Sequence, residues 1–339
     1  MRIGIVNDMR LAVEALRRVV ARRPEWQIAW IAWDGADAVA RCQADRPDLI
    51  LMDLVMPVLN GAQATQRIMR ESPCAILVVT ATLGGHMPLL FEAMGHGALD
   101  AVKTPVLGPD GRMDGAEPLL TKIAMIGRLI ESPARLVAAA HLPVAPALPG
   151  RESLTLVILG ASTGGPAALE AILSHLPPSL EAALVTIQHV DKEFAGDLAA
   201  WLSRRSPYPV AVAAAGCRPA VRTVWLAGTS DHMVLASDGT LQYTRDPVEC
   251  PFRPSVDVFC KSAAMHWRGP GVAVLLTGMG CDGGDGLLTL RRAGWHTICQ
   301  DKATSVVFGM PKAAIEAGAA AAVLPLAEIA PALTRICRK

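Results

Sequence analysis

Residues 154–176 of the 339-residue chain read LTLVILGASTGGPAALEAILSHL. The apolar run up to Gly160 predicts a buried strand, and the alanine-rich run after Gly165 predicts a helix that begins at a proline. A glycine-rich turn between a strand and a helix either binds a phosphate or presents a nucleophile. The residue at the centre of this turn is Ser162.

The residues of this turn exclude two kinds of phosphate-binding loop. A dinucleotide fingerprint requires glycine where Ser162 stands, and a Walker loop requires a Lys-Ser or Lys-Thr pair that the segment lacks. The remaining match is G-x-S-x-G, which presents a serine hydroxyl at a helix N-terminus, where free N–H groups stabilise an oxyanion. The alternative is a serine that only caps the helix.

A nucleophilic serine needs a general base, and the base needs a group that orients it. His189 ends the predicted strand 182–189, and Asp282 follows the predicted strand 271–278, so both are expected at the same sheet edge as Ser162. The alternative base is His232, which has Asp231 beside it. The alternative orienting carboxylates are Asp285 and Asp191.

Short apolar segments alternate with amphipathic ones on both sides of an Ala- and Pro-rich stretch at residues 131–153. This alternation predicts an α/β fold of two doubly wound parallel-sheet domains. The domains are expected at residues 1–124 and 153–339, with an interdomain linker at 125–152. The expected strands are residues 2–6, 27–33, 49–53, 75–80 and 98–103 in the first domain, and 155–160, 182–189, 210–216, 223–228, 271–278 and 296–300 in the second.

The composition excludes several classes of protein. A net charge of +1 gives no electrostatic signature for nucleic acid or an anionic membrane, and no apolar stretch predicts a transmembrane helix. The eight cysteines are scattered without a CxxC pair, which favours a reducing compartment over a disulfide framework or a zinc site. Charges within the first apolar run are unlike a signal peptide, so a cytoplasmic location is expected.

Polar side chains follow three strands of the predicted first domain. Asn7 and Asp8 follow the first strand, Asp53 the third and Thr80 the fourth, and each alone fits an ordinary cap or loop residue. Two carboxylates at adjacent strand ends repel one another unless a cation lies between them, and Mg²⁺ suits such oxygen ligands. Together with the segment DLVMPVLNG at 53–61, this arrangement predicts that Asp53 accepts a phosphoryl group.

This first half resembles the receiver domains of two-component signalling, which have a flavodoxin-like fold. The resemblance implies that Asp53 is the phosphorylated aspartate and that Thr80 is the switch hydroxyl. It also implies that Mg²⁺ is held by Asp8, by Asp53 and by the backbone carbonyl of Val55.

The receiver pattern changes at three positions of this sequence, of which Asn60, in place of the usual aspartate of the turn MPxxDG, matters little because both residues suit turns. Asn7 stands where the family usually has a second acid, and Thr104, in VKTP at 102–105, stands where it usually has a lysine that contacts the phosphoryl group. Lys103 lies one residue earlier, and on a strand it should point to the opposite face. Either a bulge lets Lys103 reach the site, or the phosphoryl group lacks this contact; the strand alternation favours the second.

The second half resembles the catalytic domain of the chemotaxis protein-glutamate methylesterases. The resemblance implies a triad of Ser162, His189 and Asp282, with backbone oxyanion donors at Met279 and Thr163. Cys281 replaces the family's usual asparagine, and a tolerated small residue is favoured there over a second nucleophile. The motifs that carry the resemblance are LGASTGG at 159–165, TIQH at 186–189, RPSVD at 253–257, TGMGCDG at 277–283 and VVFGMP at 306–311.

The order of receiver, linker and methylesterase domain implies a phosphorylation-regulated hydrolase of chemosensory signalling. The implied substrates are glutamate methyl esters, and also glutamines, on the cytoplasmic domains of methyl-accepting chemoreceptors, with a histidine kinase of the CheA type as phosphodonor. The esterase step needs no cofactor. Domain order suggests that the unphosphorylated receiver covers the catalytic cleft and that phosphorylation of Asp53 loosens this contact.

Two further interpretations stay open at this point. The segment RIGIVNDM at 2–9 and the Thr-Pro pair after the fifth strand are closest to the surface-sensing (Wsp-like) branch of these regulators. A non-catalytic module that joins a receiver to a receptor-binding domain is the alternative function. It predicts the loss of a triad residue, and the sequence retains all three.

Overall fold

The computed structural model describes residues 1–81, 87–107, 113–131, 154–190 and 192–338. The chain divides into two compact units, residues 1–136 and 137–339. Residues 125–131, expected to begin the linker, form the end of helix α5 (Ala116–Glu131), and the rest of that segment lies outside the described residues.

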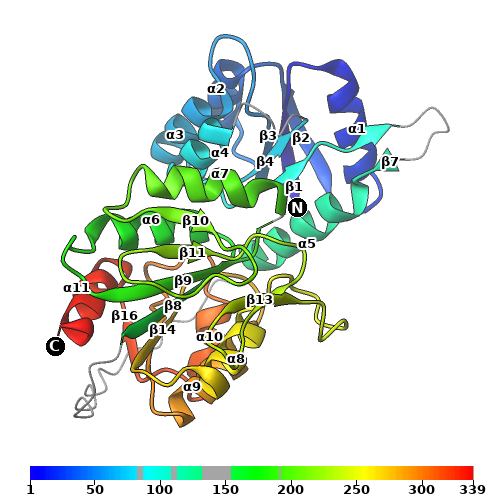
Figure 1. Cartoon of the computed structure of the whole chain (residues 1–339). Helices are drawn as coiled ribbons and strands as arrows, with labels where there is room; N and C mark the ends of the chain where they lie inside the picture. Colours follow the sequence, from blue (N-terminus) through cyan, green and yellow to red (C-terminus); the bar gives the residue numbers. More distant parts are fainter. Residues whose placement is uncertain (82–86, 108–112, 132–153, 191, 339) are drawn as a thin grey trace. The chain divides into compact units, whose positions relative to one another are not determined.

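The first unit is a five-stranded parallel sheet in the order β2-β1-β3-β4-β5. Helices α2, α3 and α4 lie on one face of this sheet, and α1 and α5 lie on the other (Figure 1). The strands are β1 (Arg2–Val6), β2 (Gln27–Ala32), β3 (Leu49–Met52), β4 (Ala75–Thr80) and β5 (Asp100–Lys103). The other elements are α1 (Arg10–Val20), α2 (Gly35–Ala44), α3 (Gly61–Glu71) and α4 (Met87–Gly95), and a short antiparallel pair, β6 (Val106–Leu107) and β7 (Met113–Asp114).

Local sequence explains where these helices begin. The Asp34 carboxylate accepts hydrogen bonds from two backbone N–H groups of the first turn of α2. Asn60 and Gln63 form a reciprocal capping box at the start of α3. The strands are aliphatic and almost fully buried, as expected for a parallel sheet covered on both faces.

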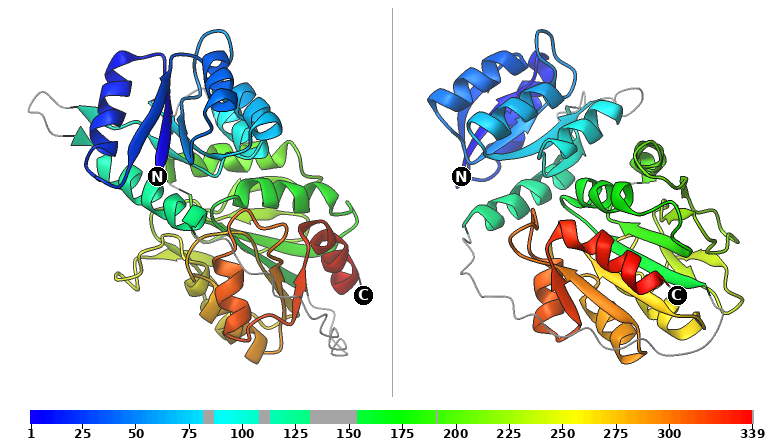
Figure 2. Two further views of the ribbon diagram at one scale, coloured as in Figure 1. Left: turned by 180° about the vertical axis from the view of Figure 1, so that it is seen from behind. Right: turned by 90° about the vertical axis from the view of Figure 1, so that its left-hand side faces the viewer.

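The second unit is a seven-stranded parallel sheet in the order β10-β11-β9-β8-β14-β15-β16. Helices α6, α7 and α11 cover one face of the sheet and α8, α9 and α10 cover the other, as Figure 2 shows from two sides. The strands are β8 (Thr155–Ala161), β9 (Ala182–Gln188), β10 (Val210–Val212), β11 (Val224–Leu226), β14 (Gly271–Leu275), β15 (His296–Gln300) and β16 (Ala322–Leu324). The helices are α6 (Gly165–His175), α7 (Lys192–Ser203), α8 (Val256–His266), α9 (Gly284–Arg292), α10 (Met310–Glu316) and α11 (Leu326–Cys337).

Both predicted parallel-sheet domains are confirmed, and the structure adds elements that the sequence did not predict. An antiparallel hairpin, β12 (His232–Leu235) with β13 (Leu241–Thr244), packs against α8, and β16 forms one edge of the large sheet. None of the helices in the described part of the chain combines the length and the hydropathy needed to cross a membrane.

Strand β8 is the central strand of the large sheet, with β9 and β14 as its two neighbours. Its register pairs Ala161 with Gln188 of β9 and Gly160 with Leu275 of β14. The polar residues that follow these three strands therefore meet at one edge of the sheet, where ligands bind in folds of this kind.

Candidate active site

Ser162 is the first residue after β8, and it does not cap the helix that follows. The N-cap of α6 is Gly164, which has a φ of 77° and no side-chain cap. A side chain at Gly164 would strain this left-handed backbone, and its Cβ would lie 2.7 Å from Val306 Cβ. The serine is thus left on a tight turn at the carboxyl end of the central strand, with no capping role.

His189 lies across the strand pair from Ser162. The backbone N–H of His189 donates to the carbonyl of Ala161 at 3.0 Å, which continues the β8–β9 ladder by one residue. The Gln188 side-chain amide donates to the carbonyls of both Ser162, at 2.9 Å, and His189, at 3.2 Å. Main-chain pairing and this amide together fix the two residues side by side.

Asp282 is the carboxylate that contacts this histidine. Asp282 Oδ2 lies 2.7 Å from His189 Nε2, and the Asp282 side chain is 3% exposed. Asp285 begins α9 and makes no hydrogen bond to His189, whereas Asp231 lies 3.8 Å from Arg245. The remaining alternative orienter, Asp191, lies outside the described residues.

Four donors surround the Asp282 carboxylate. Oδ2 accepts from Val256 N at 2.7 Å as well as from His189, and Oδ1 accepts from Ser255 Oγ at 2.7 Å and from Asp257 N at 3.2 Å. Burial by itself raises the pKa of the Asp282 carboxyl, but these hydrogen bonds and the charge of His189 outweigh it and hold the pKa below its usual range. Asp282 is therefore an ionised partner for the imidazole.

The remaining surroundings of the His189 ring suit a group that takes up a proton. The ring stacks on Phe252, and its Nδ1 atom is buried without a hydrogen-bond partner among the described residues. The Ser162 hydroxyl likewise makes no hydrogen bond to a described residue. Because Nε2 is held by Asp282, Nδ1 is the nitrogen available to take the serine proton.

The segment after β14 brings backbone donors to the nucleophile. A Cβ on Gly278 would lie 2.8 Å from Ser162 Cβ, so only glycine allows this close approach. The N–H groups of Thr163 and Met279, the expected oxyanion donors, donate to no acceptor in the part of the chain that the structure describes. Val307 holds the segment in place by accepting hydrogen bonds from Gly278 N and from Thr277 Oγ1.

The alternative base, His232, is committed elsewhere. It is fully buried in β12, its Nδ1 accepts from Ser255 N at 3.3 Å, and its Nε2 lies 3.3 Å from the carbonyl of Pro247. Both ring nitrogens of His232 have hydrogen-bond partners, whereas Nδ1 of His189 has none among the described residues. His189 is therefore the better candidate for the base. Cys281, beside Asp282 in the chain, is exposed.

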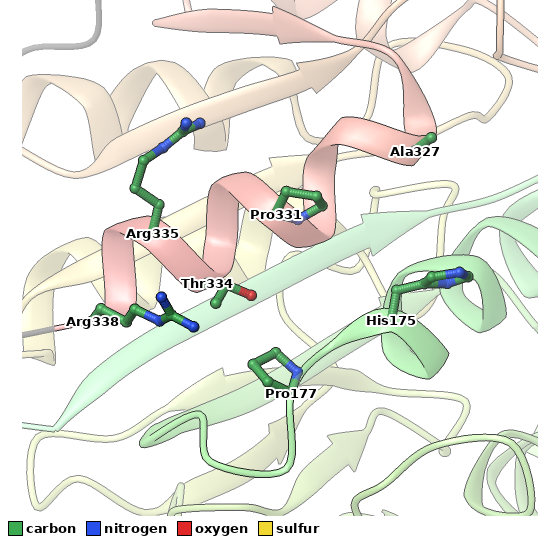
Figure 3. A pocket seen from close by; sticks show the side chains of 7 residues that line it. All are labelled: His175, Pro177, Ala327, Pro331, Thr334, Arg335 and Arg338. Atoms are coloured by element: carbon green, nitrogen blue, oxygen red, sulfur yellow. The ribbon is translucent and has the colours of Figure 1, made fainter.

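A surface cavity of about 720 Å³ lies elsewhere in this unit (Figure 3). Helix α6 begins beside Ser162 and ends at His175, so this cavity lies about 16 Å away, at the opposite end of the helix. It contains no member of the Ser162–His189–Asp282 group. Its lining residues are His175, Pro177, Ala327, Pro331, Thr334, Arg335 and Arg338.

In the first unit, the structure brings Asn7 and Asp53 together at the sheet edge. Asn7 Nδ2 donates to Asp53 Oδ2 at 3.0 Å, and Leu54 N donates to Asp53 Oδ1 at 2.7 Å. Asp53 and Thr80 are buried, whereas Asp8 is exposed. This is the geometry expected for a carboxylate pocket at the carboxyl ends of β1, β3 and β4.

The donor atoms of this pocket suit a hard cation. The Asp8 carboxylate forms no ion pair with a described residue, and the Val55 carbonyl accepts no hydrogen bond from one. Two carboxylates and a carbonyl form a sparse oxygen set, which fits Mg²⁺ because that ion keeps several waters. No cluster of three or more His, Cys, Asp or Glu side chains that could hold a metal occurs among the described residues.

Lys103 and Thr104, between which the sequence leaves the phosphoryl contact open, lie at the end of β5. Lys103, the last residue of β5, pairs with Thr80 and is exposed, whereas Thr104 is 8% exposed. The Thr104 backbone N–H donates to the Thr80 carbonyl at 3.0 Å, and its side-chain Oγ1 is buried without a partner among the described residues. The side chains of residues 103 and 104 thus differ sharply in exposure.

Comparisons with known families identify both units of the chain. The family model for the CheB methylesterase matches residues 157–333, and the model for the response regulator receiver domain matches residues 3–110. The chain belongs to the CheB methylesterase family. It combines that catalytic domain with a receiver domain, so the predicted family and fold class are confirmed, and the chain is an ester hydrolase of this family.

Relatives of the CheB methylesterase family match over the whole chain. A protein-glutamate methylesterase/protein-glutamine glutaminase of Burkholderia thailandensis is 54% identical over 339 residues, which are 100% of this chain and 98% of that protein. One of Bordetella avium is 52% identical over 99% of this chain and 97% of that protein. The crystal structure of the Thermotoga maritima CheB methylesterase catalytic domain is 36% identical with a TM-score of 0.52, covering 54% of this chain and 99% of that domain.

The structure of this CheB methylesterase also reveals site residues that sequence reasoning assigned no role. Gln188 and Ser255 lie inside motifs that the sequence analysis quoted, but only the folded chain shows what their side chains contact. Ser255 precedes an amphipathic run, which signals a helix cap. Phe252 lies in a loop, where no periodic pattern indicates its contact with His189.

Proposed function

We propose that this protein hydrolyses glutamate methyl esters on the cytoplasmic domains of chemoreceptors through an acyl-enzyme on Ser162. The observation that carries the proposal is the 2.7 Å contact between His189 and Asp282, beside a serine held in register by the β8–β9 pair. A nucleophile, a base and an orienting carboxylate are the three parts that acyl transfer requires.

The proposed reaction uses the atoms of these groups that are available to react. Ser162 Oγ attacks the ester carbonyl while His189 Nδ1 takes its proton, and Asp282 stabilises the resulting imidazolium. His189 then gives the proton to the departing methoxide, which leaves as methanol. Water, deprotonated by the same nitrogen, attacks the acyl-enzyme, and the imidazolium returns this proton to Ser162 Oγ as the glutamate carboxylate is released.

The backbone N–H groups of Thr163 and Met279 are proposed to stabilise the oxyanion of each tetrahedral intermediate. Both donors are without an acceptor in the described part of the chain, which supports this role. A glutamine side chain enters the same sequence of steps with ammonia as the leaving group, and deamidation of receptor glutamines is therefore part of the proposal.

The receiver domain is proposed to control this activity through phosphorylation of Asp53 by a histidine kinase. The buried carboxylate beside Asn7, and an Asp8 carboxylate that forms no ion pair with a described residue, support a phosphoryl acceptor next to a cation site. Mg²⁺ held by Asp8, Asp53 and the Val55 carbonyl would neutralise charge on the phosphoryl oxygens.

Methanol release from a methylated chemoreceptor cytoplasmic domain tests the esterase proposal. Ser162→Ala should abolish release, and Ser174→Ala, a matched change at an exposed serine near the end of α6, should leave it unchanged. His189→Gln should also abolish it. A wild-type rate of methanol release by the His189 variant would contradict the mechanism and would make His232 the candidate base.

Acetyl phosphate tests the control by the receiver. With Mg²⁺ present, this phosphodonor should raise the rate of methanol release from the wild-type protein but not from Asp53→Asn. Asp37→Asn, which changes a half-buried carboxylate paired with Arg41 on α2, is the matched control and should respond like wild type. A response that persists in Asp53→Asn would contradict the proposed phosphorylation site.

A further inference from the structure

The Asp282 carboxylate accepts a hydrogen bond from a side chain to which the mechanism assigns no part, that of Ser255. Ser255 Oγ donates to Asp282 Oδ1 at 2.7 Å, and the same hydroxyl oxygen accepts from Val258 N at 3.3 Å. Ser255 is fully buried and is the N-cap of α8. Because a hydroxyl has one proton, and this one goes to Asp282, the direction of the bond is fixed.

The backbone of Ser255 is held from its other side by His232. The Ser255 N–H donates to His232 Nδ1 at 3.3 Å, so His232 carries its proton on Nε2, which donates to the Pro247 carbonyl at 3.3 Å. A continuous chain of hydrogen bonds therefore runs from β12 through Ser255 and Asp282 to His189.

We propose that Ser255 is a positioning residue of the esterase, whose hydroxyl holds the Asp282 carboxylate in the orientation that directs His189 Nδ1 toward Ser162. Asp282 Oδ2 accepts hydrogen bonds from both His189 Nε2 and Val256 N, so a rotation of the carboxylate would weaken both bonds. The bond from Ser255 to the other oxygen opposes that rotation. The inference rests on the proposed function, since it gives Ser255 a part in the same reaction.

Loss of the Ser255 hydroxyl has two expected consequences. The carboxylate turns more freely, so kcat falls about 10- to 100-fold, the usual cost of a lost hydrogen bond to a charged group. KM stays unchanged, because the buried Ser255 does not reach the substrate.

The second consequence concerns the pH profile. Because the freed carboxylate turns away from His189, it stabilises the His189 cation less, so the acid limb of the kcat/KM profile moves to lower pH. The other ionisable groups near Asp282 in the described residues include Asp257 and Cys260, whose pKa values its charge raises, its chain neighbour Cys281, and Lys261 and Asp285, whose charges act on Asp257; they are the same in every variant compared.

Three variants of Ser255 in the full-length chain distinguish its role in positioning Asp282 from its role as the cap of α8. Ser255→Gly and Ser255→Ala both remove the hydroxyl, but glycine caps a helix almost as well as serine. Both should show the low kcat and the shifted acid limb, whereas Ser255→Thr keeps the hydroxyl and should restore both. Ser262→Ala, on the same helix, is the matched control, because Ser262 bonds to Leu235 N and the Phe259 carbonyl.

A wild-type kcat and pH profile in Ser255→Gly would overturn the proposal, and so would an equal shift in Ser262→Ala. An NMR titration of the His189 ring in the full-length chain needs no turnover, and its midpoint should move to lower pH in Ser255→Gly. If the wild-type protein releases no methanol, the proposed function fails, while an unmoved titration midpoint overturns the role of Ser255 by itself.

Discussion

The imidazole of His189 stacks on the ring of Phe252, with the ring centroids 4.8 Å apart and an angle of 7° between the planes. The stack covers one face of the base and limits its rotation about χ2. A stacked aromatic pair contributes about 0.5–1.5 kcal/mol beyond its buried area, which corresponds to a rate factor of about 2–10. Phe252→Leu should lower kcat of methanol release by that factor. Phe252→Tyr retains the ring and is its control; an equal loss in both variants would contradict the role of stacking.

Replacing the orienting carboxylate by an amide should be far more damaging. In Asp282→Asn, an N–H₂ group faces one of the donors that now surround the carboxylate, and the imidazolium loses its counter-charge. Where an aspartate orients the catalytic histidine of a serine protease, this change costs about 10⁴-fold in kcat. Asp285→Asn, a nearby carboxylate without contact to His189, should keep the wild-type rate; a comparable loss there would move the orienting role to Asp285.

The buried Asp257 predicts a pH-dependent change in stability. Burial raises the pKa of Asp257 to about 6, the hydrogen bond from Gly286 N opposes this rise, and the charge of Asp282 adds to it. The folded pKa thus lies above the unfolded value of about 3.9. The stability that this carboxyl contributes is complete below pH about 3.9 and is lost as the pH rises through about 6.

Asp257→Asn should therefore stabilise the catalytic domain near pH 8, because asparagine keeps an acceptor for Gly286 N without the buried charge. After allowance for solvent screening, the expected gain is about 1 kcal/mol, or about 2–4 °C in Tm. The gain should disappear near pH 4 in calorimetric scans. Asp197→Asn, at an exposed position on α7, should show no gain at either pH; a gain for Asp257→Asn that persists at pH 4 would refute the electrostatic cause.

The buried hydroxyl of Thr104 predicts an unusual stabilising substitution in the receiver domain. Its Oγ1 has no partner among the described residues, and an unpaired buried polar group costs about 1–3 kcal/mol. Thr104→Val should therefore raise the Tm of the receiver transition in calorimetry. Thr65→Val is the matched control and should lower the Tm, because Thr65 Oγ1 donates a hydrogen bond to the Gly61 carbonyl at 2.7 Å. Destabilisation in both variants would show that the Thr104 hydroxyl is satisfied.

The sheet edge that carries the site could be predicted from the sequence because its strands are unambiguous. Strands β8, β9 and β14 are predominantly aliphatic runs that end in polar or glycine-rich turns, and the order of such βα units restricts them to a parallel sheet. His189 and Asp282 were placed at one edge by that argument alone, 93 residues apart in the chain, and they meet at 2.7 Å.

The surroundings of the triad could not be predicted in the same way. The β12–β13 hairpin consists of two four-residue strands with polar residues on both sides, too short for periodicity to identify. A serine before an amphipathic run predicts the cap of α8, but it does not predict that the hydroxyl donates to a carboxylate 27 residues away. Such contacts depend on how separate elements pack, which local sequence does not encode.

The register of β8 and β9 limits how this enzyme can change over evolution. Ser162 and His189 each follow a paired residue, Ala161 and Gln188, so main-chain hydrogen bonds set the distance between the proposed nucleophile and base. Substitutions along either strand preserve that distance, whereas the insertion or deletion of one residue would turn every later side chain to the opposite face of the sheet. Point mutations in the surrounding loops can therefore change what the site binds while the spacing between Ser162 and His189 stays intact.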